Sequence, residues 1–347
     1  MNKHIISPRF RREGFTFYSD SILQMEHITS VKQKLENGVY HLKANTCICG
    51  ESKGVVIAEV ERYGLPLNSE LCLNCGTVRI NPYPDEESIT DFYAHEYQYM
   101  YNRSSDNAVY FERQKQYGVK FLSLAEPFLQ QKNWVLEVGC GAGGALVPFL
   151  NFGCKVAGCD YDARLLEYGK KNGISDLYFG SLNNLNKHLP LIKAELIFMN
   201  HVFEHVENPL ELLKSCKQKL SSSGKIIISV PDLTRVDQFD FFKGNLLPMF
   251  HIAHKYNFTV EGLTILAGKA GLKLKILQPD SNIVTHTSIM PEIWVEFKPA
   301  NEVKFDLQPN IGNKVINKLQ QLEKIYQKRS VKRNFRSIIQ RMIYRNR

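Results

Sequence analysis

A glycine-rich segment in the middle of the chain is suited to close contact with a ligand. It spans residues 137–144, with the sequence EVGCGAGG, and follows an apolar run at 134–138. Glycine lets the backbone approach a ligand where a Cβ atom would clash, and N–H groups at the start of a helix favour a carboxylate or a phosphate. Asp160 ends the next apolar run, where a carboxylate suits the hydroxyl groups of a ribose. These residues predict a nucleotide-binding turn.

The glycine spacing alone leaves two nucleotides open, because residues 139–144 also satisfy the Gly-x-Gly-x-x-Gly pattern of NAD-binding folds. Glu137, directly before the loop, favours S-adenosylmethionine (SAM), since an acid there can hold the amino-acid end of this methyl donor. The mid-chain position of the loop and the lack of a Tyr-x-x-x-Lys pair for hydride transfer favour the same ligand. We therefore predict that SAM is bound by Glu137, Gly139, Gly141, Gly143 and Asp160.

Two histidines and an acid follow the predicted strand at 195–199. His201, Glu204 and His205 are spaced i, i+3 and i+4, so on a helical turn they share a face. Methyl transfer to oxygen requires positioning of the acceptor and removal of its proton. The three side chains are therefore candidates for a basic or orienting role in catalysis. A divalent-metal site and a purely structural role are the alternatives.

Four cysteines in the first quarter of the chain have the chemistry of a zinc site. Cys47 and Cys49 form one pair, and Cys72 and Cys75, followed by a glycine, form the second. Thiolates bind zinc tetrahedrally, and the second pair has the usual Cys-x-x-Cys spacing, whereas the first has one intervening residue. We predict a structural zinc ion on these four residues, with a redox or unliganded role as the alternative.

The elements that must position these residues alternate along the chain. Apolar runs predict strands at 134–138, 155–159, 195–199, 225–230, 272–278 and about 284–297. Helices are predicted near 143–152, 162–172, 209–220 and 259–270, the third ending at 221–224. Strands alternating with helices of this length predict a parallel, doubly wound α/β sheet.

The chain divides into five segments by composition and pattern. They are an N-terminal extension at 1–45, a zinc-binding module at 46–84, a helical connector at 85–130, a nucleotide-binding domain at 131–300, and a basic amphipathic helical tail at 301–347.

Positive charge is concentrated in the tail. The chain of 347 residues has a net charge of +9, and residues 323–347 contain nine Lys or Arg and one acid. Apolar residues recur there at helical spacing, namely Val315, Leu319, Leu322, Tyr326, Val331, Phe335, Ile338 and Met342. Such a helix suits an anionic membrane surface, RNA, the protein body or a second copy of the chain. Because the rest of the chain is nearly neutral, we expect no nucleic-acid partner.

The composition predicts a cytoplasmic protein. The N-terminus lacks an apolar signal region, and no run of ~18 apolar residues predicts a membrane span. The eight cysteines are accordingly interpreted as thiols or metal ligands, not disulfides. The basic tail suggests a peripheral location at the inner face of the membrane.

Residues 134–297 resemble class I SAM-dependent methyltransferases. The resemblance rests on the Glu-x-Gly-x-Gly-x-Gly segment, on Asp160, and on the segment NHVFEH at 200–205. It implies a Rossmann-like sheet of seven strands, here with a small N-terminal zinc-binding module and a basic C-terminal helix. It also implies that Ser181 and Leu182 border the adenine and that Asn200 belongs to the cofactor site.

The N-terminal part resembles bacterial methyltransferases with a zinc-binding module, among them sugar methyltransferases encoded with surface-polysaccharide genes. The similar residues are RYGLPL at 62–67, the stretch from 72 to 84, and aromatic residues at 92, 93 and 97. This resemblance implies O-methylation of a saccharide or a comparable small hydroxylated acceptor. An RNA methyltransferase and a non-catalytic assembly protein are the alternatives. A homodimer is a further expectation, since the C-terminal helix could pair with a second copy.

Residues 201–205 also resemble the metal-binding segment of metal-dependent methyltransferases. Ubiquinone-type O-methyltransferases and small-RNA 2′-O-methyltransferases use an acid, a Glu and a His at matching positions with magnesium or manganese. Here His201 stands in place of the first acid. We therefore do not expect magnesium, although the residues at 251–258 include two further histidines that could act as ligands.

Overall fold

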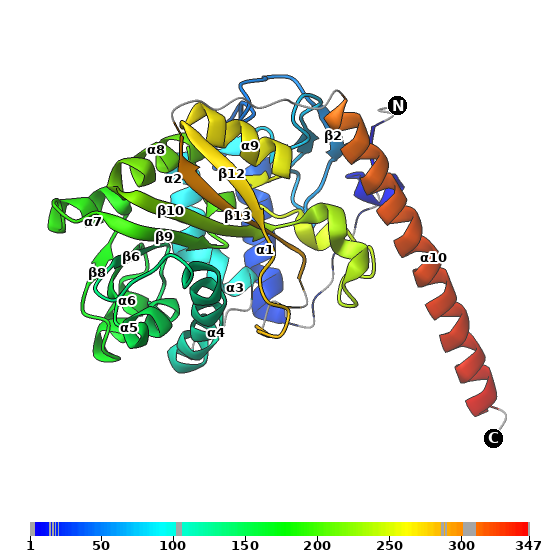
Figure 1. Ribbon diagram of the computed structural model, residues 1–347. Coiled ribbons are helices and arrows are strands. Elements are labelled where there is room, and N and C mark those ends of the chain that lie inside the picture. The colour runs from blue at the N-terminus through cyan, green and yellow to red at the C-terminus, as the bar shows by residue number, and fades with distance from the viewer. Residues whose placement is uncertain are drawn as a thin grey trace.

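A computed structural model describes residues 4–13, 15, 17, 19, 21–101, 106–285, 288, 290–300 and 310–345, with the backbone alone for 331–345. Its centre is a seven-stranded sheet in the order β12-β13-β10-β9-β6-β7-β8 (Figure 1). The strands are β6 (Trp134–Val138), β7 (Lys155–Asp160), β8 (Leu177–Phe179), β9 (Ala194–Asn200), β10 (Leu220–Pro231), β12 (Leu272–Leu277) and β13 (Glu292–Pro299). β6 to β10 run parallel, and β13 is antiparallel to both neighbours.

Helices cover both faces of this sheet. In Figure 1, α4 (Asn107–Ala125), α5 (Val147–Phe152) and α6 (Ala163–Lys171) lie below it, with the 3-10 turn η3 (Gly144–Leu146) before α5. On the opposite face lie α7 (Leu182–His188), α8 (Pro209–Lys219) and α9 (Val260–Lys269). Successive β9 residues Leu196 and Ile197 pack into different cores, one on each face. Both faces are therefore buried, which explains the continuous apolar runs.

The sheet confirms the predicted α/β class and corrects several details. It is mixed, not wholly parallel, because β13 inserts antiparallel between β10 and β12. The short strand β8 and helix α7 were not predicted, and β13 begins at 292, not near 284. Residues 221–224, expected to end α8, lie within β10, where the pairing with β9 is irregular between Leu220 and Lys225.

The cysteine pairs belong to a second sheet of four strands. Its order is β11-β4-β3-β2, with β2 (Val55–Ala58), β3 (Ser69–Leu71) and β4 (Val78–Ile80) from the predicted zinc module. The fourth strand, β11 (Tyr256–Asn257), comes from the segment between β10 and α9. β1 (Leu42–Lys43) and β5 (Tyr83–Pro84) form a separate antiparallel pair. This four-stranded sheet is thus completed by a distant part of the chain.

The N-terminal segment and the connector are largely helical. The elements are η1 (Pro8–Phe10), α1 (Ile22–Glu36), α2 (Glu86–Asp91), the π-helical turn η2 (Phe92–Glu96) and α3 (Tyr97–Met100). No helix was predicted at 22–36, yet α1 is capped by Ser21 and buries Ile28, Val31 and Leu35. Glu96 of η2 accepts hydrogen bonds from Ser30 and His27 of α1, so α1 holds this connector in place.

α10 (Ile311–Arg345) confirms the predicted C-terminal helix. Val315, Leu319 and Leu322 of the predicted stripe are buried, and they pack with η5 (Leu233–Gln238) and η6 (Leu247–Met249) in one core. The second half of α10 extends away from the body (Figure 1). The continuation of the stripe, Val331, Phe335, Ile338 and Met342, lies where side chains are outside the described residues.

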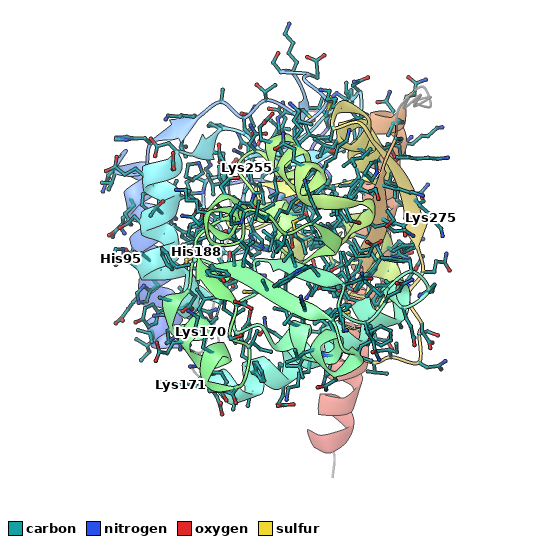
Figure 2. The ribbon with its side chains drawn as sticks, turned by 60° about the vertical axis from the view of Figure 1, so that its left-hand side comes forward. His95, Lys170, Lys171, His188, Lys255 and Lys275 are labelled. Carbon is teal, nitrogen blue, oxygen red and sulfur yellow. The ribbon has the colours of Figure 1, made fainter. Side chains whose placement is uncertain are left out.

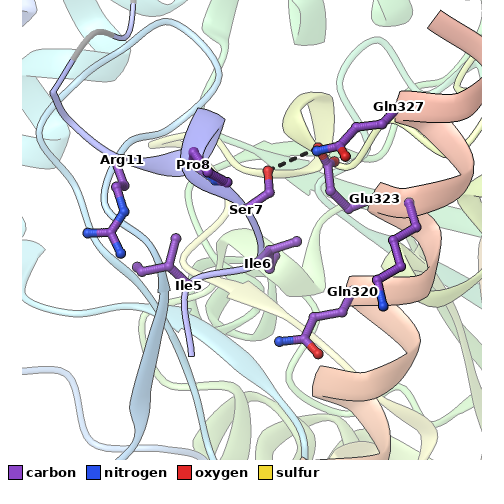
Figure 3. Close-up of a pocket in the computed structure, with 9 residues that line it drawn as sticks. Ile5, Ile6, Ser7, Pro8, Arg11, Gln320, Glu323 and Gln327 are labelled. Atoms are coloured by element: carbon purple, nitrogen blue, oxygen red, sulfur yellow. Dashed lines mark hydrogen bonds between the residues drawn. The ribbon is translucent and has the colours of Figure 1, made fainter. Parts of the chain in front are cut away.

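A cavity of about 410 Å³ lies between the N-terminal segment and α10. Ser7 and Gln327 both donate hydrogen bonds to Glu323 at its wall (Figure 3). It shares no residue with the glycine loop or with the histidines after β9.

Charged side chains of the body are spread over its surface. Figure 2 shows His95 and Lys275 at opposite edges of the molecule, with Lys170 and Lys171 together on α6. None of the helices in the described part of the chain has the length and apolar character required to cross a bilayer.

Candidate active site

The predicted glycine loop leaves the C-terminal end of β6 in a strained path that glycine permits. Gly139, Gly141 and Gly143 have φ values of 72°, 53° and 73°. A Cβ atom at Gly139 would collide with the side chain of Val202, and one at Gly141 would lie 2.7 Å from the Tyr110 hydroxyl oxygen. The three glycines are therefore required by the local geometry.

Most N–H groups of the loop donate hydrogen bonds within the protein. Those of Gly139 and Cys140 donate to the Cys159 carbonyl, and that of Gly141 donates to Asp160 Oδ2 at 2.8 Å. The N–H of Gly144 donates to Gln114 Oε1. A pyrophosphate bound at a helix start requires such donors, so this arrangement disfavours the dinucleotide alternative.

Two carboxyl groups, the buried Glu137 and the half-buried Asp160, lie at the ends of β6 and β7. Glu137 is 2% exposed, and its Oε2 has no hydrogen-bond partner among the described residues. Burial, reinforced by the charge of Asp160, raises the pKa of Glu137 well above its usual range. Burial also raises the pKa of Asp160. A ligand with positive ammonium and sulfonium groups would stabilise the charged form of these acids, so the residues fit SAM.

The region expected to border the adenine contains aromatic residues that sequence reasoning missed. Tyr161 is 70% exposed and Phe179 is 60% exposed, and their ring centroids are 6.0 Å apart. They adjoin Asp160 and Ser181, so they offer apolar surface to a base. Ser181 caps α7, whereas the side chain of Leu182 is buried in the core, which leaves only its backbone for a nucleotide. An exposed aromatic residue directly after Asp160 was the signal available in the sequence.

Asn200 and His201 follow at the end of β9. Asn200 Oδ1 accepts a hydrogen bond from Ser229 Oγ at 2.6 Å, which ties its side chain to β10, the neighbour of β9 on the side away from β6. His201 has a left-handed backbone with φ of 51° and precedes the 3-10 turn η4 (Phe203–His205). The predicted shared helical face is therefore wrong for His201, because the chain reverses before the turn begins.

Glu204 nevertheless lies at the centre of a histidine cluster. It is 1% exposed, and neither carboxylate oxygen has a hydrogen-bond partner among the described residues. Its Oε1 is 3.5 Å from His201 Nδ1, 3.8 Å from His205 Nε2 and 3.7 Å from His254 Nε2. The structure brings the three predicted residues together and adds His254 from the segment after η6.

His201 is held as a cation by two acids. Its Nε2 lies 2.7 Å from Glu292 Oε1 of β13, and its Nδ1 faces Glu204. Burial alone would lower the pKa of His201, but these hydrogen bonds and charges raise it to about 10. A permanently protonated imidazole cannot act as a base near neutral pH, so His201 orients Glu204 instead.

His205 has the arrangement of a base. Its Nδ1 lies 2.6 Å from the Ala253 carbonyl, and we assign the proton to Nδ1 because a carbonyl can only accept. The lone pair then lies on Nε2, which faces Glu204. The Tyr93 hydroxyl, from the π-helical turn, lies 3.1 Å from the same Nδ1. Sequence reasoning did not assign Tyr93 to the site.

A divalent ion also fits this cluster, with a different ligand set from the one predicted. Ligand atoms of Glu204, His205 and His254 all lie within 4.8 Å of one another. His201 is engaged by Glu292 and lies outside this set. Two imidazoles and one carboxylate suit manganese, iron or zinc better than magnesium, which prefers oxygen ligands.

The four predicted cysteines converge. Cys47 Sγ is 3.4 Å from Cys75 Sγ, Cys49 Sγ is 3.5 Å from Cys72 Sγ, and all four sulfurs lie within 4.8 Å of one another. Tetrahedral zinc with Zn–S bonds of about 2.3 Å requires sulfur separations of ~3.8 Å. The residues fit a zinc ion despite the short spacing of the first pair.

Comparisons with known proteins agree with this geometry. A family model for a methyltransferase domain matches residues 110–275. The ubiquinone biosynthesis O-methyltransferase of Haemophilus ducreyi is 29% identical over 115 residues, which are 29% of this chain and 46% of that protein. The trans-aconitate 2-methyltransferase of Rhizobium etli is 28% identical over 111 residues, which are 31% of this chain and 43% of that protein. The chain spans 41% to 55% of the length of the curated relatives that it matches.

Solved structures give distant likenesses. A SAM-dependent methyltransferase from Archaeoglobus fulgidus has a TM-score of 0.42 and 20% identity, covering 56% of this chain and all of that one. The plantazolicin methyltransferase BpumL in complex with SAH has a TM-score of 0.45 and 16% identity, covering 60% of this chain and 93% of that one. The sheet order, the loop geometry and the family match define residues 110–275 as a class I SAM-dependent methyltransferase domain.

Proposed function

We propose that the protein transfers a methyl group from SAM to a hydroxyl group of a small acceptor, with a saccharide as the expected class. The observation that carries the oxygen acceptor is His205, whose Nδ1 is bound to the Ala253 carbonyl and whose Nε2 is thereby left as a base. It follows β9 directly, at the strand ends where α/β sheets bind their ligands.

Each residue of the proposed site has a distinct role in methyl transfer. SAM supplies an electrophilic methyl group when bound at Glu137 and Asp160. His205 Nε2 accepts the proton of the acceptor hydroxyl as its oxygen forms the new bond to carbon, and S-adenosylhomocysteine leaves. Glu204, 3.8 Å away, stabilises the imidazolium that results. His201, itself held by Glu292, orients Glu204.

Removal of the base tests this proposal. We expect His205→Ala to lower the turnover of a hydroxylated acceptor by about 10²-fold or more, as is usual for loss of a general base, with unchanged SAM affinity. Formation of S-adenosylhomocysteine and calorimetric titration with SAM measure the two effects. His95→Ala is the matched control, since His95 is exposed on η2. Absence of SAM binding by folded wild-type protein would refute the proposal.

A metal-assisted variant of the same reaction is favoured by the cluster of Glu204, His205 and His254. In that case a bound ion would polarise the acceptor oxygen. Metal analysis of protein purified without added metals, compared with His254→Gln, tests it. Turnover that is unaffected by EDTA and by this substitution would exclude the metal.

We also propose that Cys47, Cys49, Cys72 and Cys75 hold a structural zinc ion, as their convergence supports.

We further propose that residues 323–347 contact an anionic membrane surface, a proposal that rests on the sequence alone. Flotation of the full chain with phosphatidylserine vesicles tests it, and recovery in the pellet at every salt concentration would rule it out.

A further inference from the structure

Helix α4 packs closely on the turn η3, which directly follows the glycine loop. A Cβ atom at Gly118 of α4 would collide with the Ala145 carbonyl of η3, and one at Gly144 would collide with the Phe111 carbonyl of α4. Glycine at these two positions lets the two backbones come this close. The close approach brings a side chain of α4 within reach of the backbone of the glycine loop.

Gln114 of α4 contacts the loop with both ends of its side-chain amide. Its Nε2 donates a hydrogen bond to the Cys140 carbonyl at 2.7 Å, and its Oε1 accepts one from the Gly144 N–H at 3.2 Å. Because a backbone carbonyl only accepts and a backbone N–H only donates, these partners settle the orientation of the amide. Gln114 therefore bridges residues 140–144 from the side of α4.

The bridged segment needs such support because of its composition. Gly141 and Gly143 have left-handed backbones, and glycine loses more conformational freedom on ordering than any other residue. The N–H of Gly141 also donates to Asp160 Oδ2. In the proposed site, however, Asp160 has to bind the hydroxyl groups of the ribose as well, whereas both ends of the Gln114 amide are engaged by the loop. Gln114 is thus a support that a bound nucleotide need not displace.

We infer that Gln114 is a positioning residue for the methyl donor, which holds residues 140–144 in the conformation that binds SAM and does not contact SAM itself. The inference rests on the proposed function, because it requires that the glycine loop binds SAM. A loop that is competent for only a fraction of the time binds its ligand more weakly by that fraction. Loss of the bridge should therefore slow association with the donor, whereas loss of a direct contact would speed dissociation.

Binding of S-adenosylhomocysteine to the full chain tests this inference, because this probe requires no acceptor. Gln114→Met keeps the length and the helix propensity of the side chain and removes both hydrogen bonds. We expect calorimetry to show about tenfold weaker binding to this variant. Surface plasmon resonance should assign the loss to slower association, with dissociation nearly unchanged. Hydrogen exchange of the Gly144 N–H should be faster in the unliganded variant than in the wild type.

Gln116→Met is the matched control, since Gln116 is exposed on the same helix and its variant should bind the probe like the wild type. If Gln114→Met does not fold, Gln114→Glu takes its place with the same expectations, because it keeps the acceptor for Gly144 and lacks the donor for Cys140.

Three results would overturn the inference. A Gln114 variant with a lower free energy of unfolding but wild-type affinity for S-adenosylhomocysteine would show a purely structural role. A loss carried by faster dissociation would show that Gln114 contacts the donor, and an equal loss in Gln116→Met would show an effect of α4 as a whole. In each case the wild type still binds the probe and the proposed function stands, whereas a wild type that does not bind S-adenosylhomocysteine refutes both.

Discussion

Glu137 is the side chain that we expect to bind the ammonium group of SAM. It is buried at the end of β6 with an unpaired Oε2, and its raised pKa favours the neutral form in the absence of a ligand. The ammonium group of SAM favours the carboxylate. Binding should therefore release a proton wherever Glu137 is protonated in the free protein, and SAM affinity should fall as the pH falls.

Replacement of Glu137 by glutamine, its neutral isostere, removes the coupling between SAM binding and proton release. We expect Glu137→Gln to weaken SAM binding about tenfold at pH 8 and to flatten its pH dependence. Calorimetry in buffers of different ionisation enthalpy counts the protons. Glu211→Gln, an exposed acid paired with Lys214, is the control. A pH dependence that is equally steep in Glu137→Gln would assign the linkage to another group.

At the scale of elements, the second cysteine pair lies at a junction between helices in addition to forming part of the proposed zinc site. The N–H of Gly312, at the start of α10, donates to the Leu73 carbonyl at 3.1 Å, and Thr259 Oγ1, which caps α9, donates to the Cys75 carbonyl at 2.8 Å. The turn between the two cysteines therefore supports one helix of the methyltransferase domain and the C-terminal helix together.

Loss of one cysteine should accordingly loosen distant elements. We expect Cys72→Ser to lose zinc, to lower the free energy of unfolding by several kcal/mol, and to lose hydrogen-exchange protection around residue 312. Metal analysis and hydrogen exchange measure this. Cys154→Ser, a buried cysteine outside the cluster, should keep full zinc content. A Cys72→Ser variant with full protection at 312 would contradict the junction.

At the scale of the whole molecule, the two ends of the chain are tied together. Arg9 Nε and Nη2 lie 2.6 Å and 2.7 Å from the two oxygens of Glu323, which is buried in α10. The guanidinium also lies 4.5 Å from the ring centroids of Phe10 and Tyr326. This paired contact holds the first half of α10 on the body, from which the second half extends.

Breaking one partner of this pair leaves a buried charge. We expect Arg9→Met to destabilise the protein by about 3 kcal/mol and the double variant with Glu323→Met to recover most of the loss. Chemical denaturation measures both. Arg11→Met is the control, because the Arg11–Glu59 pair is 3.9 Å long and partly exposed, and should cost less than about 1 kcal/mol. If the double variant were no more stable than Arg9→Met, the ion pair itself would be shown to stabilise the fold.

The local patterns of the sequence determined the α/β class, the glycine turn and the position of Asp160 at a strand end. They also indicated a shared site for the four cysteines and a helix at the C-terminus. Each depends on periodicity or on spacing within one turn or one strand, which neighbouring residues dictate by themselves. The interpretation of His201 shows the limit of such reasoning. Its spacing to Glu204 and His205 suited a helix, but a left-handed residue intervened.

Only the tertiary structure decided which distant segments meet at the site. His254 lies 50 positions after Glu204 (254 − 204), and Glu292 lies 91 positions after His201 (292 − 201), yet both reach the residues after β9. β11 completes the four-stranded sheet from farther away, since Tyr256 pairs with Arg79 across 177 positions (256 − 79). Tyr93 approaches His205 from the N-terminal side. No local pattern encodes such contacts, because they arise from the packing of elements whose order in space differs from their order in the chain.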